Sequence, residues 1–123
     1  MLSAYSTNIT VAADAAIPFE NIAVEKGCTA VLRSPATISL NKCGVYMVNA
    51  GVSSAASETI QLYKDGVAVP GAISTGLSPF FSTLVQVTES NGACACKAPT
   101  NIQVVATTAG TLTDARVTVT KIC

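Results

Sequence analysis

The chain contains no histidine and no tryptophan, and its aromatic residues are three tyrosines and three phenylalanines. Without histidine, Ser-His and Cys-His activation of a nucleophile and the usual proton shuttle near neutral pH are excluded. The seven carboxylates are isolated from one another in sequence, so no local motif pairs two of them for glycoside hydrolysis. No glycine-rich phosphate loop precedes a helical segment. We therefore expect a protein that is not an enzyme and uses no cofactor.

Charge is also scarce, with seven basic and seven acidic residues among 123, about half the usual share. The basic residues are scattered, so the sequence offers no positive stripe for a phosphate backbone and predicts no nucleic-acid partner. No apolar run approaches the roughly 20 residues that cross a bilayer, so no membrane partner is expected. Residues 1–6 lack the basic and apolar regions of a signal peptide, which predicts no secretory route.

In place of charge the chain has 26 serines and threonines, while half of its residues are apolar. Apolar surface that charged groups do not interrupt is often covered by another subunit, because monomers rarely expose large apolar patches. A homo-oligomer is the first interpretation. A monomer coated with Ser and Thr side chains is the alternative, and composition alone leaves both open.

The pattern of apolar residues predicts an all-β chain of about eight short strands in one domain, residues 1–123. Strands at this spacing favour an antiparallel β-sandwich, of which the jelly roll is a common form. Residues 1–8 precede the first strand candidate and are a candidate N-terminal attachment arm. The strand candidates are residues 9–11, 22–24, 29–32, 38–40, 44–52, 80–88, 102–107 and 115–122, residues 60–71 are read as a hairpin, and the predicted loops are 53–58, 73–78 and 89–99.

Two strands carry apolar residues on both faces, which is typical of strands at a subunit interface. Tyr46 lies on one face of its strand and Met47 on the other, and Phe80 and Phe81 divide in the same way. Tyr46 is interpreted as a core or interface anchor. For the phenylalanine pair we expect one ring inside the sandwich and one against a neighbouring subunit. The predicted interface residues are therefore Tyr46, Met47, Phe80 and Phe81.

The dipeptide Asp65-Gly66 predicts the turn of a β-hairpin, because these residue types readily adopt the positive φ angles of a tight two-residue turn.

Cysteine is the strongest chemical irregularity of the sequence. The five residues Cys28, Cys43, Cys94, Cys96 and Cys123 make an odd number, so they cannot all pair within one chain. Cys94 and Cys96 have a spacing that could hold Zn or Cu(I), but without histidine a zinc site would need four cysteines from three regions, so no metal site is predicted. Disulfides are the alternative in an oxidising setting, and buried free thiols are the preferred interpretation.

Two motifs carry a family resemblance. Ile-x-Leu-x-x-x-Gly-x-Tyr-x-Val spans residues 38–48, and apolar-x-Leu-x-x-Asp-Gly-x-x-Val-Pro-Gly spans residues 60–71. Together they resemble the trimeric jelly-roll domains related to tumour necrosis factor and the complement heads, and most of all their bacterial and bacteriophage versions. The resemblance implies a homotrimer. The Gly-X-Y repeats of stalked members are absent, which weakens a spore-surface interpretation.

Two functions remain after these exclusions. The resemblance implies a structural virion component, either a capsid decoration or a head-fibre protein, which would be made in a host cytoplasm and contact a capsid shell protein. The alternative is a lectin-like or receptor-binding module of a phage, or of a bacterial cell or spore surface, whose loops bind a glycan or a host receptor. A sugar site usually has an exposed aromatic ring beside amides and carboxylates, and the few aromatic residues favour the structural role.

Overall fold

The structure is a computed structural model that describes residues 1–27, 30–87 and 100–122. These ranges form eleven strands and no helix, so the described chain has no helix that could span a membrane. The strands are β1 (Leu2–Val11), β2 (Ala15–Ala16), β3 (Asn21–Glu25), β4 (Ala30–Ser34), β5 (Thr37–Leu40), β6 (Gly44–Ser54), β7 (Glu58–Lys64), β8 (Val67–Gly76), β9 (Phe80–Val87), β10 (Thr100–Ala106) and β11 (Gly110–Lys121).

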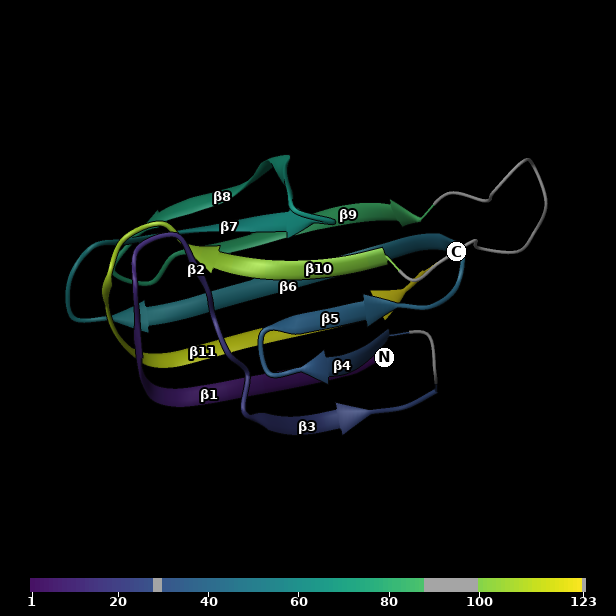
Figure 1. Ribbon diagram of the computed structural model, residues 1–123, viewed down its shortest axis with the longest axis horizontal. Helices are drawn as coiled ribbons and strands as arrows, with labels where there is room; N and C mark the ends of the chain where they lie inside the picture. Colours follow the sequence, from purple (N-terminus) through teal and green to yellow (C-terminus); the bar gives the residue numbers. More distant parts are fainter. Residues whose placement is uncertain (28–29, 88–99, 123) are drawn as a thin grey trace.

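The strands form two sheets packed face to face (Figure 1). One sheet has the order β3-β1-β11-β6-β9, and the other has the order β4-β5-β10-β7-β8, with the two-residue β2 beside β10. Every recorded pairing is antiparallel. The predicted all-β antiparallel sandwich is therefore confirmed, with more strands than the eight expected.

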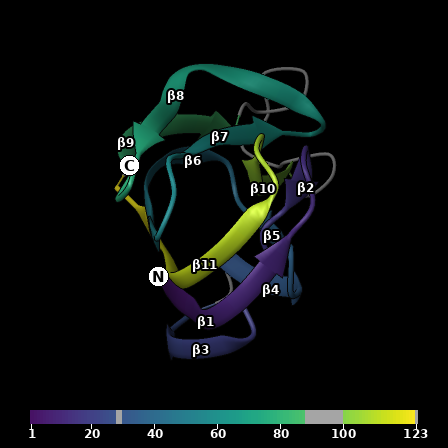
Figure 2. The ribbon, with the colours of Figure 1, turned by 90° about the vertical axis from the view of Figure 1, so that its left-hand side faces the viewer.

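The two sheets face each other in the view along the strands (Figure 2). The buried apolar side chains form the core between them. Side chains alternate along each strand, so every second residue points inward. On β6 the inward residues are Tyr46, Val48, Ala50 and Val52, and on β9 they include Phe81, Val85 and Val87. The predicted division of these two strands into faces is confirmed.

Two predicted interface residues are in fact core residues. Tyr46 is fully buried and Phe81 is 5% exposed within the single chain, so neither can reach a neighbouring subunit. The Tyr46 hydroxyl donates a hydrogen bond to the carbonyl oxygen of Lys42 at 2.7 Å. Burial raises the pKa of Tyr46 above its usual value, because the phenolate would lose its hydration there.

The N-terminal residues do not form an attachment arm. Residues 2–11 make the ten-residue strand β1, which pairs with β11 on one side and β3 on the other. Leu2 and Ala4 are buried in the core. The prediction of an arm at residues 1–8 is therefore wrong, because the polar residue Ser6 takes an inward, buried position and interrupts the apolar alternation that indicates a strand.

The turn between β7 and β8 has the geometry that its sequence indicates. Asp65 has φ +49° and Gly66 has φ +82°, the signs that a type I′ turn requires. After the turn, β8 continues to Gly76, so the loop predicted at residues 73–78 is mostly strand. Between β6 and β7 only residues 55–57 form a connection, which shortens the loop predicted at residues 53–58. The loop predicted at residues 89–99 lies outside the described residues.

Candidate functional site

The outer face of the sheet β3-β1-β11-β6-β9 carries large apolar side chains exposed to solvent. Tyr5 of β1 is 41% exposed, Met47 of β6 is 38% exposed, and Phe80 and Leu84 of β9 are 59% and 57% exposed. These residues occupy the outward positions of strands whose alternate residues are buried. We call Tyr5, Met47, Phe80 and Leu84 the exposed apolar face.

Strand register groups these residues into rows that run across the sheet. Tyr5 pairs with Arg116, Arg116 pairs with Gly51, and Gly51 pairs with Phe80, which makes one row across four strands. Met47 pairs with Leu84 in a second row. Small polar residues fill the row between these two: Ser3, Thr118, Asn49 and Ser82.

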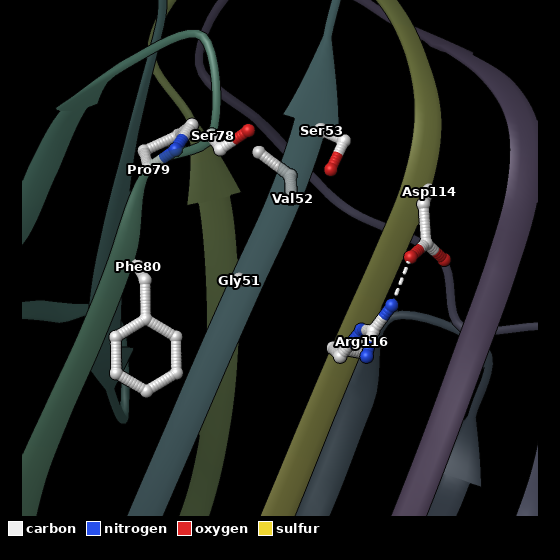
Figure 3. A pocket seen from close by; sticks show the side chains of 8 residues that line it. All are labelled: Gly51, Val52, Ser53, Ser78, Pro79, Phe80, Asp114 and Arg116. Atoms are coloured by element: carbon white, nitrogen blue, oxygen red, sulfur yellow. Dashed lines mark hydrogen bonds and ion pairs between the residues drawn. The ribbon is translucent and has the colours of Figure 1, made fainter.

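A shallow depression of about 260 Å³ lies at one end of this face, between Phe80 and Arg116 (Figure 3). Gly51 forms its floor, and a Cβ atom placed on this glycine would lie 3.2 Å from Cδ2 of Phe80. The absence of a side chain therefore allows the ring to lie close against β6. Ser53, Ser78 and Pro79 complete the rim.

The charged groups of the depression neutralise each other. Arg116 Nη2 forms an ion pair with Asp114 Oδ2, two residues earlier on β11 (Figure 3). The Arg116 side chain is 70% exposed, so this pair contributes little to stability. Its effect is to leave the face without net charge, which suits contact with an apolar and uncharged surface.

The structure brings together only part of the predicted interface set. Met47 and Phe80 lie on the exposed apolar face, whereas Tyr46 and Phe81 lie in the core. Sequence reasoning missed Tyr5 and Leu84. Leu84 lies four residues after Phe80 and so on the same strand face, and that periodicity could have identified it. Tyr5 was missed because residues 1–8 were assigned to an arm.

Cys43 is disulfide-bonded, which corrects the preference for a free thiol at this residue. The other predicted cysteine residues, Cys28, Cys94, Cys96 and Cys123, lie outside the described residues. In the described part of the chain, no group of three or more His, Cys, Asp or Glu residues is placed to hold a metal ion.

No protein-family model and no curated protein sequence matches the chain. Solved structures do match it. The globular domain of zebrafish complement 1qA superposes with a TM-score of 0.78 at 10% identity, over 99% of this chain and 96% of that chain. Murine APRIL at pH 8.5 gives 0.68 at 10% identity over 98% of both chains. Rabbit GITRL gives 0.61 at 11% identity, over 100% of this chain and 95% of that chain.

The chain has the fold of the TNF-like and complement-head domains. Identity near 10% establishes the fold, and function has to be argued from the surface of this jelly roll. On that surface the side chains of the exposed apolar face come from three strands of one sheet, β1, β6 and β9, and from both halves of the sequence.

Proposed function

We propose that this jelly roll is a non-enzymatic structural module that assembles as a homotrimer through its exposed apolar face. The observation that carries the proposal is the outward exposure of Tyr5, Met47, Phe80 and Leu84 on one sheet. Contact between water and such a group of large apolar side chains is unfavourable. Burying these side chains in an interface stabilises the oligomer by about 25 cal/mol per Å² of apolar surface removed from water. Aromatic residues and methionine are also the types enriched at interface centres.

Charge does not oppose this association. The chain has no net charge, so copies do not repel one another at long range. Arg116 and Asp114 form a neutral pair beside the apolar residues. Three copies, rather than two, are supported by the sequence resemblance to trimeric jelly-roll domains and by the fold shared with the complement and TNF-like structures.

The particle role is the finer part of the proposal. We infer that the trimer is a bacteriophage virion component, either a capsid decoration or a head-fibre protein, which is made in a host cytoplasm. The support is the sequence resemblance to the phage versions of this domain. A low-charge β-sandwich that self-associates is also suited to bind a shell at symmetry-related sites.

The first test is the solution mass of the purified chain by light scattering after size exclusion. We expect about three times the chain mass of 12.5 kDa, with and without reductant. The double substitution Phe80→Ser and Leu84→Ser should shift the mass toward that of one chain, because it removes two interface anchors. Val67→Ser is the matched control, since Val67 is 69% exposed on the other sheet and should leave the mass unchanged.

A monomeric wild-type chain at every concentration would refute the homotrimer, and so would a mass that the double substitution leaves unchanged. The particle role has its own test, which is the copy number of the chain in particles purified from producing cells, measured by mass spectrometry. We expect a fixed ratio to the main shell protein. Complete recovery of the chain in the fraction that does not sediment would contradict the virion role.

A further inference from the structure

A second depression, of about 390 Å³, lies on the opposite sheet, away from the exposed apolar face. Its lining is polar and consists of Thr37, Asp65, Gly66, Asn101 and Gln103. Asn101 and Gln103 alternate along β10 with the buried Ile102 and Val104, so their side chains belong to the outer face of this sheet. Its volume is within the range of roughly 300–1,000 Å³ that is typical of small-molecule sites.

Hydrogen bonds hold the lining groups in place. Asn101 N donates to Asp65 Oδ1 at 2.9 Å, and Asp65 N donates to the Asn101 carbonyl oxygen at 2.8 Å. Gln103 Nε2 donates to Thr37 Oγ1 at 3.1 Å. These contacts join β5, β10 and the β7–β8 turn, so the side chains are positioned by three separate backbone segments.

Hydrogen-bonding capacity remains after these contacts. Among the described residues, none donates a hydrogen bond to Asn101 Oδ1, although this atom is buried. Within the same part of the chain, Asp65 Oδ2 and Gln103 Oε1 accept no recorded hydrogen bond, and the Thr37 hydroxyl hydrogen remains available to donate. Because Asn101 Oδ1 is closed off from solvent, the unpaired groups that a ligand in the depression can use are Asp65 Oδ2, Gln103 Oε1 and the Thr37 hydroxyl.

We infer that this depression binds a neutral saccharide. Hydroxyl groups both donate and accept, so the hydroxyls of one sugar ring can satisfy a carboxylate, two carboxamides and a threonine together. Asp65 would accept from two adjacent hydroxyls, Gln103 would accept through Oε1, and Asn101 would donate through Nδ2. Tyr63 pairs with Gln103 in the β7–β10 register and lies on the same sheet face, so it would contact a ligand that extends beyond Gln103.

Other ligand classes fit the depression less well. An anion would be repelled by Asp65, the one carboxylate in the lining. A Ca²⁺ ion takes six to eight oxygen ligands and usually several carboxylates, whereas this lining has one. The inference does not depend on the homotrimer, because the depression lies on the sheet that does not carry the exposed apolar face.

The test is a titration of the ¹⁵N-labelled full chain with D-glucose, D-galactose and D-mannose up to tens of millimolar, followed by amide NMR shifts. For at least one hexose we expect saturable shifts at Gly66, Asn101 and Gln103. Thr37→Val and Gln103→Leu should each weaken binding by about two- to tenfold, the loss expected for one hydrogen bond. Gln61→Leu is the matched control, since Gln61 lies on β7 outside the lining and should change nothing.

Absence of shifts for all three sugars would overturn the inference, as would equal affinity in the Gln103→Leu and wild-type chains. Saturable shifts of the same amides with CaCl₂ but not with the sugars would replace the saccharide with a cation. Light scattering of the same samples separates this result from the homotrimer. A monomer that binds sugar supports the saccharide site and refutes the trimer. A trimer that binds no sugar supports the trimer and refutes the saccharide site.

Discussion

Glu58 lies at the start of β7 with only 2% of its surface exposed. Its Oε1 atom is buried and has no hydrogen-bond partner among the described residues. Its Oε2 atom lies 3.0 Å from the position that a Cβ atom on Gly110 would take, so the glycine makes room for the carboxylate. A buried carboxylate oxygen that lacks a hydrogen-bond donor is unfavourable, so this side chain lowers the stability of the folded chain.

We expect Glu58→Gln to raise the free energy of unfolding at neutral pH by about 1–3 kcal/mol, because a neutral amide is less costly to bury than a carboxylate. Urea unfolding at one fixed protein concentration measures the change. Glu25→Gln on the exposed strand β3 is the control and should have almost no effect. A large loss of stability in Glu58→Gln would mean that the carboxylate has a partner in the assembled protein.

Tyr46 provides a prediction about alkaline pH. Its pKa is raised in the folded chain by burial, whereas in the unfolded chain it returns to the usual value for tyrosine, about 10. Below pH 10 both states keep the proton. As pH rises above 10, the unfolded state releases its proton first, so the unfolded state gains stability and the folded state loses it.

We expect unfolding free energy to fall as pH rises above about 10, and Tyr46→Phe to reduce this slope. At neutral pH the same substitution should cost about 0.5–1.5 kcal/mol, because the Lys42 carbonyl loses its hydrogen-bond donor. Thermal unfolding at a series of pH values provides both results. An unchanged slope in Tyr46→Phe would refute the assignment.

At the scale of elements, the β7–β8 turn places two consecutive residues, Asp65 and Gly66, at positive φ angles. Gly66 has φ +82°, a conformation that costs an L side chain about 1–2 kcal/mol. Gly66→Ala should therefore lower unfolding free energy by about this amount, while Gly66→Asn should lose less, because asparagine tolerates this region. Denaturant unfolding of both variants tests the turn. Equal stability of the alanine variant and the wild type would contradict the assigned geometry.

Strands differed in how well they could be predicted. The strand β6 was found because its inward residues Tyr46, Val48, Ala50 and Val52 are all apolar. The strand β1 was missed between Leu2 and Asn8, where Ser6 takes an inward position. Ser6 is fully buried, and its Oγ donates to the Pro18 carbonyl and accepts from Glu20 N, both at 2.7 Å. A polar residue that is satisfied by a distant segment breaks the alternation on which strand prediction depends.

For the whole molecule, the two sheets present outer faces of different chemistry. The outer face of β1, β11, β6 and β9 carries Tyr5, Met47, Phe80 and Leu84, whereas the outer face of β5, β10 and β7 carries the polar depression around Asn101. We therefore assign association to one face and ligand binding to the other. A trimer formed through the apolar face would leave the polar face open to solvent.

The sequence by itself determined the all-β class, the inward and outward faces of β6 and β9, and the Asp65-Gly66 turn. These properties are local, because side-chain alternation and positive φ angles depend on neighbouring residues. Only the tertiary structure decided which apolar residues stay exposed, since Phe80 and Phe81 differ only in whether the second sheet covers them. The polar depression also forms only in the tertiary structure, because Thr37, Asp65 and Asn101 are far apart in sequence and meet only when β10 pairs with β5 and β7.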